Sequence, residues 1–348
     1  MAPFHTQEKW DNSGLLVGRG DALVTRVLLT LDITPAAVEE AVRQGTELIV
    51  SHHPVIFQPL KRLDPDSPVY RMAQNGISAV CAHTNLDKAY GGVNDCLAER
   101  LGLKNVRVFG VDGRERYYKL VVFVPESHET AVRAAIVGAG AGTIGCYTGC
   151  TFSGAGIGRF RPEVGAQPWL GSVGTEEEAR EIRLEVVVPA GQLDAVLAAM
   201  RAAHPYEKPA YDVFESVRQG REIAIGRLGE LPAPLSPALF AAFAAKQLGA
   251  SVRYNRGGRE IHRVAVLGGA GGGYLYEAAA MGADTLVTGE AKHHEYLDAE
   301  AMGVTLIDAT HYATEQVVLG PLAQYLQERF PEVSFRLFSG GDVLDFIG

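Results

Sequence analysis

The stretch TELIVSHHPVIF, residues 46–57, joins an apolar run to two adjacent histidines. The run TELIVS predicts a short, buried β-strand. His52 and His53 follow it directly, and Pro54 then stops the strand. Because neighbouring residues of an extended strand point to opposite faces, the two imidazoles should leave the strand in different directions. The stretch therefore places two ligand-type side chains at the end of one buried strand.

The segments around this strand alternate between strand and helix patterns. Strands are predicted at 26–33, 46–51 and 77–83, and helices at 34–45, 67–76 and 93–103. The first helix has clear ends, since Thr34 can cap it, Pro35 lies just inside and Gly45 lies just past its last turn. Strands that alternate with helices predict a parallel sheet, and hence an α/β fold.

The middle of the chain has a different pattern. Residues 118–142 and 183–205 look like copies of one unit, in which an apolar strand is followed by Val-Pro and an amphipathic helix. Further strand-like sequence follows each copy, at 144–154 and 210–217. Two βαβ halves of this kind predict a ferredoxin-like α+β domain, which we place at 114–218.

The first pattern then returns, with strands at 261–269, 283–290 and 304–311 and a helix at 315–330. We therefore expect one α/β domain, formed by residues 1–113 and 219–348, that is interrupted by the inserted domain. Three consecutive domains are the alternative. A length of 348 residues is compatible with two or three domains.

Charge, hydropathy and cysteine content argue against several classes of protein. The net charge of −9 and the lack of a Lys/Arg cluster argue against a nucleic-acid-binding surface, although a bound metal ion can still attract a nucleotide. No apolar run approaches the roughly 18 residues of a membrane span, and the first residues do not form a signal pattern. Four cysteines are too few for a disulfide framework. We expect a reduced, cytoplasmic protein that contacts neither a membrane nor nucleic acid.

Ligand-type residues follow four of the predicted strands. In chain order they are His52, His53, His83, Asp87, Glu290, His293, His294, Asp308, His311 and Glu315. Ligands bind at the carboxyl ends of parallel strands, so these residues converge on one edge if the strands share a sheet. Imidazole and carboxylate suit Zn, Mn, Fe and similar divalent ions. A single histidine at a strand end is commonly a surface residue, but three such strand ends together indicate a metal site.

The glycine run VLGGAGGGYLYEAAA, residues 266–280, follows a strand and opens a helix. That is the context of a phosphate site at a helix N-terminus. However, Tyr274 stands where the dinucleotide fingerprint needs glycine, and no lysine completes a Walker loop. A phosphate site and a tight turn both remain open. The sequence has no Gly-x-Ser-x-Gly motif, which disfavours covalent acyl transfer.

Several blocks together resemble one known family. WDNSGLLVG (10–18), SHHPVIF (51–57), AHTNLD (82–87), GGVNDCLAERLGL (91–103) and THYATE (310–315) are similar to the signature blocks of GTP cyclohydrolase I type 2, or Nif-three-like, proteins. The resemblance covers nearly the whole chain. The middle unit, which ends in HPYEKPAYDV (204–213), resembles the CutA/PII-like insertion of longer bacterial members. Members usually have an amphipathic helix before the WDN block. Only nine residues precede Trp10 here, so we expect either a start internal to the gene or a missing helix.

The resemblance implies a dinuclear site for two divalent ions, with Zn, Mn or Fe as candidates. Its ligands would be His52, His53, Asp87, His311 and Glu315. Glu315 would bridge the two ions, and each of the adjacent histidines would serve a different one. The candidate catalytic residues, which would face the substrate or orient the ligands, are His83, Glu290, His293 and His294.

The resemblance also implies a two-lobed α/β domain that assembles into a toroidal homohexamer. The expected activity is metal-dependent hydrolysis of a small-molecule substrate, a nucleotide such as GTP. The alternative is a non-enzymatic metal-binding or regulatory assembly, because the insertion resembles sensor domains. The sequence selects neither the native metal nor the substrate.

Overall fold

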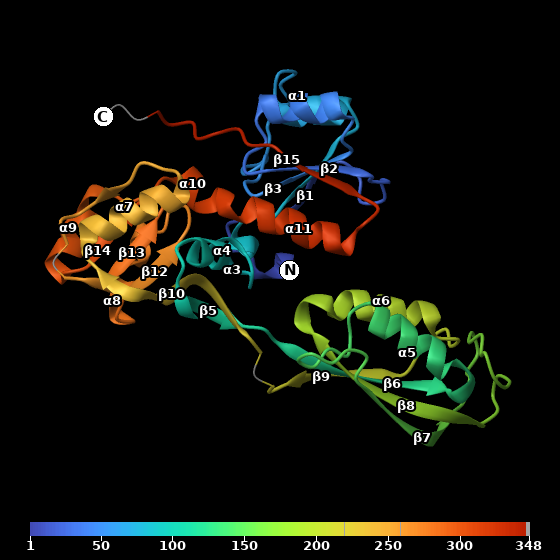
Figure 1. The fold of residues 1–348 in the computed structure, drawn as a ribbon. Helices are drawn as coiled ribbons and strands as arrows, with labels where there is room; N and C mark the ends of the chain where they lie inside the picture. Colours follow the sequence, from blue (N-terminus) through green and yellow to red (C-terminus); the bar gives the residue numbers. More distant parts are fainter. Residues whose placement is uncertain (219, 258, 346–348) are drawn as a thin grey trace. The chain divides into compact units, whose positions relative to one another are not determined.

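The computed structural model describes residues 1–218, 220–257 and 259–345. The chain divides into two compact units (Figure 1). The first, here called the discontinuous unit, consists of residues 1–112 and 223–348. The second, the inserted unit, consists of residues 113–222. Within the described residues, no helix has the length and apolar composition needed to cross a membrane.

The first sheet of the discontinuous unit contains the strand that ends in the histidine pair. Its order is β1 (Gly14–Val17), β4 (Ser78–Cys81), β3 (Leu48–Ser51), β2 (Arg26–Thr30) and β15 (Ser334–Leu337). The last four strands are parallel, and β1 runs antiparallel to β4. The predicted strands therefore form a parallel sheet, while β1 and β15 occupy edge positions that the sequence pattern did not reveal.

The central strands β2, β3 and β4 are buried on both faces, which explains why they are almost continuously apolar. On β2, Leu28 packs against α1 (Pro35–Gln44) and α2 (Pro68–Gln74), while Val27 and Leu29 belong to a second core on the opposite face. α1 starts and ends as its sequence predicts. The Thr34 hydroxyl accepts a hydrogen bond from the Ala37 amide, and Gly45 adopts a left-handed conformation after the last turn.

The second sheet has the order β11 (Arg253–Tyr254), β14 (Thr305–Asp308), β13 (Thr285–Thr288), β12 (Ile261–Leu267), β10 (Glu222–Leu235) and β5 (Lys104–Arg114). Strands β12, β13 and β14 are parallel. Its helices are α7 (Pro237–Leu248), α8 (Leu275–Ala280) and α9 (His293–Met302). The two sheets share one core, since Leu29 of the first and Val266 of the second belong to the same cluster of buried side chains.

Four helices lie at the junction of the two sheets: α3 (Thr84–Lys88), α4 (Val93–Arg100), α10 (His311–Glu315) and α11 (Leu319–Arg329). The helix predicted at 315–330 is thus two helices, joined by the 3₁₀ turn Gln316–Val318. Further 3₁₀ turns are Phe4–Thr6, Glu126–His128, Ala190–Gln192 and Gly272–Tyr274. The short helices α3 and α10 directly follow β4 and β14, so they stand at the carboxyl ends of one strand from each sheet.

A buried arginine fixes α3 and α4 against the second sheet. Arg227 on β10 donates to the Asp95 carboxylate of α4 and to the carbonyls of Lys88 and Ala89 at the end of α3. Asn94 of α4 adds a second bridge, because its amide NH₂ donates to the Asp87 carbonyl and its oxygen accepts from the Gly268 amide. Residues of the GGVNDCLAERLGL block therefore hold α3 and α4 against the second sheet.

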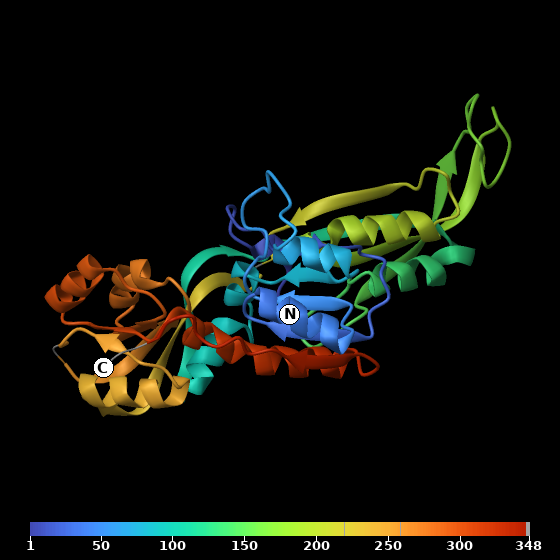
Figure 2. The same ribbon diagram turned by 90° about the horizontal axis from the view of Figure 1, so that it is seen from above.

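The inserted unit has the chain order β6 (Tyr117–Pro125), α5 (Glu129–Gly138), β7 (Thr151–Phe160), β8 (Glu177–Pro189), α6 (Leu193–Ala203) and β9 (Tyr211–Ser216). The sheet order is β7-β8-β6-β9, with every neighbouring pair antiparallel. Helices α5 and α6 lie side by side on one face of this sheet (Figures 1 and 2). The two Val-Pro patterns fall at equivalent positions, at the ends of β6 and β8.

Candidate metal centre

The predicted ligands come together between the two sheets of the discontinuous unit. His52 and His53 follow β3, and Asp87 lies on α3 after β4, so these three come from the first sheet. His311 and Glu315 lie on α10 after β14, which belongs to the second sheet. The expectation of a single sheet edge is therefore wrong. The clusters converge because the carboxyl ends of strands from two different sheets face the same junction.

The Glu315 carboxylate lies at the middle of the cluster. Its Oε2 atom is 2.9 Å from His53 Nε2 and 3.1 Å from His311 Nε2. Its Oε1 atom is 3.7 Å from His52 Nε2, which in turn is 3.5 Å from Asp87 Oδ1. One carboxylate is thus within reach of three imidazoles.

These atoms form overlapping groups that can hold a metal ion. One group is His53, His311 and Glu315, and another is His52, Asp87 and Glu315. Both contain Glu315, and each contains one member of the histidine pair. In each group the candidate ligand atoms lie within 4.8 Å of one another. Imidazole nitrogen with carboxylate oxygen is a donor set that suits Zn, Mn or Fe.

The three imidazoles all present the same nitrogen to the cluster. His52 Nδ1 is 2.9 Å from the Ala82 carbonyl oxygen. His53 Nδ1 is 2.7 Å from Asp32 Oδ1, and His311 Nδ1 is 2.8 Å from Glu290 Oε1. Carbonyl and carboxylate oxygens only accept, so each Nδ1 carries the proton and donates it. Each Nε2 atom then faces the cluster, and once the ring is neutral its lone pair is available to a metal ion, as in metal-binding histidines.

Buried atoms without hydrogen bonds support the fit of this cluster to a metal ion. Buried polar atoms are normally hydrogen-bonded. In the part of the chain that the structure describes, His52 Nε2 and Asp87 Oδ1 are buried and lack such a bond, and the buried Glu315 Oε2 has only the imidazoles of His53 and His311 within reach. All three are candidate ligand atoms, and all three point into the same small volume. A cation bound among them would satisfy atoms that the protein itself leaves unsatisfied.

The charges of the cluster are strongly coupled. Burial opposes the ionised form of Glu315, but the neighbouring imidazoles outweigh it and hold its pKa well below the usual range. Burial and the nearby Glu315 raise the pKa of Asp87 to about 7, despite the opposing effect of His52. Burial disfavours a charged His53, yet Asp32 and Glu315 raise its pKa to about 10. Burial also disfavours a charged His311, but Glu315 and Glu290 outweigh it and raise the pKa of His311 to about 9.

His83 stands beside the histidine pair with a different set of partners. Its ring centre is 5.3 Å from that of His52 and 5.6 Å from that of His53, and the three form a further group able to hold an ion. His83 Nδ1 lies 2.8 Å from Asp11 Oδ1. The rings of Trp10 and Phe57 lie 6.1 and 6.4 Å from His83, so an aromatic wall flanks this side of the cluster.

Two of the partners, Asp11 and Asp32, are functional residues that sequence reasoning missed. Asp11 belongs to the WDN block, and it also accepts from the Thr84 amide at the start of α3. Asp32 follows β2, the strand next to β3. Asp32 could have been found from its position, because it lies at the end of a predicted parallel strand, and the histidines were identified by the same kind of position.

The glycine run passes directly over Glu315. Gly269 has a φ of +64°, and a Cβ atom built there would lie 2.2 Å from Glu315 Oε1. A Cβ atom on Gly289, after β13, would lie 2.7 Å from His311 Cα. The structure thus accounts for these glycines by close packing against α10, which supports the tight-turn interpretation. It does not test phosphate binding.

Three of the candidate catalytic residues lie near α9. Glu290 hydrogen-bonds to His311, so it orients a candidate ligand. His293 and His294 lie in the first turn of α9 and are exposed, and neither belongs to the metal-holding groups found among the described residues. Between α9 and α10, Glu290 and His311 line a cavity of about 700 Å³ together with Arg253, Lys292 and Thr310.

Metal binding should release protons and strengthen as the pH rises. With pKa values of about 10 and 9, His53 and His311 are protonated at pH 7 in the metal-free protein. Imidazole binds a metal only when Nε2 is deprotonated, and Asp87, with a pKa of about 7, must be ionised to bind one, so we expect at least two protons to leave per chain. Calorimetric titrations with Zn²⁺ or Mn²⁺ at pH 7, in buffers of different ionisation enthalpy, measure this number. Heats that do not depend on the buffer would contradict the assignment.

A methyl group at position 269 should disturb the centre selectively. Gly269→Ala places Cβ against Glu315 Oε1 in a strained backbone conformation, so we expect metal affinity to fall by at least tenfold, roughly 1.4 kcal/mol. Gly273→Ala is the matched control, because a Cβ atom there meets nothing within 4 Å. Equal metal affinity in the two variants, measured by titration of folded protein, would show that Glu315 is not a ligand.

Comparison with known proteins shows the family to which the chain belongs. The DUF34/NIF3 (NGG1p interacting factor 3) family matches residues 1–339. The "GTP cyclohydrolase 1 type 2 homolog" of Halalkalibacterium halodurans is 41% identical over 307 residues, which cover 86% of this chain and 82% of that protein. The protein of the same name from Bacillus subtilis is 40% identical over 309 residues, with 87% and 83% covered.

Solved structures give the same result. A Bacillus cereus protein related to NIF3 matches with a TM-score of 0.80 and 36% identity, covering 100% of this chain and 96% of that one. The Staphylococcus aureus protein SA1388 matches with a TM-score of 0.70 and 32% identity, with 99% and 95% covered. Because the family match and these relatives span most of the chain, the protein belongs to the DUF34/NIF3 family.

Proposed function

We propose that the protein is a metal-dependent hydrolase that uses two divalent ions and acts on a nucleotide, with GTP as the first candidate. The observation that carries this proposal is the sharing of Glu315 by two ligand groups, one with His53 and His311 and one with His52 and Asp87. A carboxylate between two ligand sets is the arrangement expected of a bridging ligand. A pair of divalent ions would supply Lewis-acid activation of water and of the bond under attack.

The side chains around the ligands would orient the ligand atoms and transfer protons. Glu290 and Asp32 hold the rings of His311 and His53, and so fix the direction of both Nε2 atoms. His83 is positioned to move a proton, because its Nδ1 atom bonds to Asp11 while the ring lies against both His52 and His53. A histidine oriented by a carboxylate in this way is a common general acid or base.

The cavity between α9 and α10 supports a polar substrate. It adjoins His311 and Glu290, and it is lined by two basic residues, Arg253 and Lys292, and by the acids Glu295 and Asp308, the second of which pairs with Arg253. Its volume of about 700 Å³ falls within the roughly 300–1,000 Å³ of small-molecule sites. A nucleotide could place its phosphates near the cations while its reacting bond lies at the ligand cluster.

The name "GTP cyclohydrolase 1 type 2 homolog" of the relatives is the reason to start with GTP. It suggests opening of the guanine ring with loss of formate. Hydrolysis of a phosphoester would use the same ligands and the same proton-moving histidine, so both reactions belong in the assay. Metal binding without turnover is the alternative, and it would make the protein a metal-binding or regulatory assembly.

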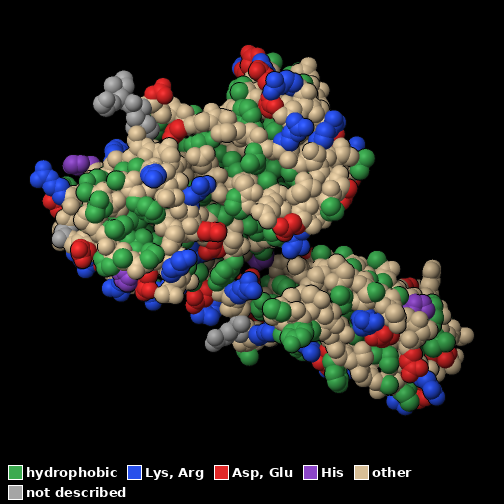
Figure 3. Space-filling view, viewed as in Figure 1, with side chains coloured by type: hydrophobic (Ala, Val, Ile, Leu, Met, Phe, Trp, Pro, Cys, Tyr) green, Lys and Arg blue, Asp and Glu red, His purple; other side chains and the backbone are tan. Residues whose placement is uncertain are grey.

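We further propose that the inserted unit is a ferredoxin-like domain of the CutA/PII-like kind, that the chain forms a homohexamer, and that it is cytoplasmic. The β6-α5-β7-β8-α6-β9 order and the β7-β8-β6-β9 sheet support the first proposal. Light scattering tests the second, since a hexamer has six times the 37.3 kDa of one chain. On the face seen in Figure 3, lysines and arginines are interspersed with acids, which agrees with a partner other than nucleic acid.

Turnover after metal reconstitution tests the proposed activity. Protein loaded with Mn²⁺, Zn²⁺ or Fe²⁺ is assayed on GTP and on simple phosphodiesters, and its metal content is measured in parallel. We expect Glu315→Ala to lose both metal and turnover. His83→Gln should keep the metal but lose roughly 10²–10⁴-fold in rate, the usual contribution of general acid–base catalysis.

The variant His294→Gln is the matched comparison. His294 is exposed on α9 and is absent from the metal-holding groups of the described residues, so its rate should stay close to that of the unmodified protein. A larger loss in His294→Gln than in His83→Gln would reverse the two assignments. Stoichiometric metal without turnover on any of these substrates would favour the regulatory alternative.

A further inference from the structure

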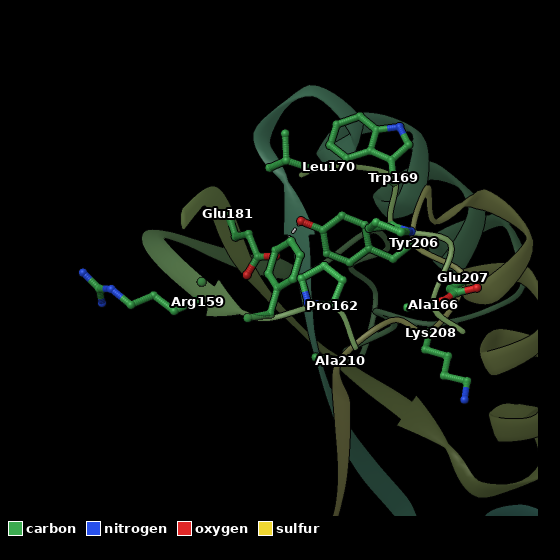
Figure 4. A pocket seen from close by; sticks show the side chains of 13 residues that line it. Arg159, Pro162, Ala166, Trp169, Leu170, Glu181, Tyr206, Glu207, Lys208 and Ala210 are labelled. Atoms are coloured by element: carbon green, nitrogen blue, oxygen red, sulfur yellow. Dashed lines mark hydrogen bonds between the residues drawn. The ribbon is translucent and has the colours of Figure 1, made fainter. Parts of the chain in front are cut away.

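The inserted unit contains a cavity of its own, of about 250 Å³ (Figure 4). It lies where the end of β7 and the start of β8 meet the loop 161–176 and the segment 204–210 after α6. The metal centre uses none of its residues. Its volume is just below the roughly 300–1,000 Å³ of pockets for drug-sized ligands, so it fits a small molecule.

Aromatic rings form the walls of this cavity. The ring centre of Tyr206 lies 6.0 Å from that of Phe160 and 5.9 Å from that of Trp169. The wall is held in place from behind. His204 Nε2 donates to the Phe123 carbonyl over 2.9 Å, and His204 Nδ1 accepts from the Tyr206 amide over 3.1 Å. These bonds hold the backbone of Tyr206 in place beside the cavity.

A carboxylate faces the same space. Glu181 is only 8% exposed and lines the cavity, and its Oε1 atom accepts a hydrogen bond from the Tyr206 hydroxyl at 2.9 Å. Burial and this carboxylate raise the pKa of Tyr206, so the hydroxyl stays protonated and donates. A Cβ atom at Gly158 would lie 2.2 Å from Glu181 Oε2. A side chain at this position would displace the carboxylate from its present place.

The charge of Glu181 lacks a cationic partner. No ion pair of Glu181 occurs among residues 1–218, 220–257 and 259–345. The two basic residues at the rim do not supply one. Arg159 pairs with Glu178 instead, and both Arg159 and Lys208 extend away from the cavity in Figure 4. A nearly buried carboxylate with a single hydrogen bond is unfavourable unless a donor or a cation completes it.

We propose that this cavity binds a small organic cation with a guanidinium group. The guanidinium would donate N–H groups to the Glu181 carboxylate, and its flat face would lie against the rings of Trp169 and Tyr206. Guanidinium combines planar donors that match a carboxylate with a weakly hydrated face that stacks on aromatic rings. An anion is disfavoured, because the carboxylate faces the cavity and the rim cations do not.

The guanidinium can come from two sources, a free small molecule or an arginine side chain of a second copy of the chain. Trp169 at the rim is 48% exposed, so either can reach the rings. Agmatine serves as the probe for both, since it presents the group on a short apolar chain.

Tryptophan fluorescence gives a direct readout, because the chain has only two tryptophans. In a Trp10→Phe background, Trp169 is the sole emitter, and agmatine should change its emission with a saturable dose response. Glu181→Gln keeps the shape of the side chain and removes its charge, and it should weaken binding at least tenfold. Asp194→Asn is the matched control, because it removes an exposed carboxylate of the inserted unit that does not line the cavity, and it should bind agmatine normally.

Tyr206→Phe provides a second variant that keeps the aromatic wall and removes only the hydroxyl that holds Glu181. It should weaken agmatine binding less than Glu181→Gln does. The proposal is overturned if agmatine produces no saturable change, or if Glu181→Gln and Tyr206→Phe both bind as tightly as the parent. Stronger binding of an anionic probe, inorganic phosphate, than of agmatine would also overturn it.

Sedimentation velocity separates the two sources. If a second copy supplies an arginine, then agmatine and Glu181→Gln should each reduce the size of the assembly. If a free molecule is the ligand, agmatine should bind at Trp169 while the sedimentation coefficient stays unchanged. Both results support the guanidinium site, and they differ in which molecule fills it.

Discussion

The structure of the discontinuous unit depends on one buried carboxylate, that of Glu315. A carboxylate removed from water is strongly destabilising unless cations or donors surround it. Here three imidazoles from two sheets surround it, with His53 and His311 nearest. The backbone next to α10 adopts an unusual conformation that places Glu315 among these imidazoles. Thr310, one residue before α10, has φ +65° and ψ 147°, a conformation that is strained by roughly 1–3 kcal/mol for a residue other than glycine.

The strained and closely packed residues around Glu315 all help to position the candidate ligand atoms. Gly269 leaves space for the carboxylate, while Asn94 and Arg227 hold the carbonyls of Asp87 and Lys88. Each imidazole is oriented through its Nδ1 atom by an acceptor that cannot donate. The protein therefore builds a set of Nε2 and carboxylate atoms that face one another, and the polypeptide leaves His52 Nε2 and Asp87 Oδ1 without a hydrogen bond. A divalent cation is the partner that fits such a set.

Much of this could be predicted from the sequence, because local signals were strong. The histidine pair ended a strand, Thr34 and Gly45 bounded α1, and all five predicted ligands meet in the structure. The division between two sheets could not be predicted, since β3 and β14 have the same pattern of short apolar strand and polar end. Asp11 and Asp32 were missed for a related reason. A single acid beside a strand can be recognised as part of the site only when the fold shows that it hydrogen-bonds to the Nδ1 atom of a particular histidine.

The inserted unit shows how position in space, and not sequence pattern, defines a site. Its repeated Val-Pro pattern predicted strands and helices, yet the Glu181 carboxylate looked like any other charge on a β-strand. It becomes notable because Tyr206 and Gly158 lie against it while Arg159, at the rim of the same cavity, pairs with Glu178. The two units thus each contain an incompletely satisfied carboxylate, one set among imidazoles and the other among aromatic rings. Their chemistry suits different ligands, a metal ion in one case and an organic cation in the other.

The central claim is that Glu315 is shared by two ions, each of which takes one histidine of the pair. Anomalous scattering from crystals loaded with Mn²⁺ or Zn²⁺ tests it most directly. The account predicts two peaks roughly 3.5–4 Å apart, one beside His52 and Asp87, the other beside His53 and His311, and both beside Glu315. A single peak, or two peaks of which neither contacts Glu315, would contradict it.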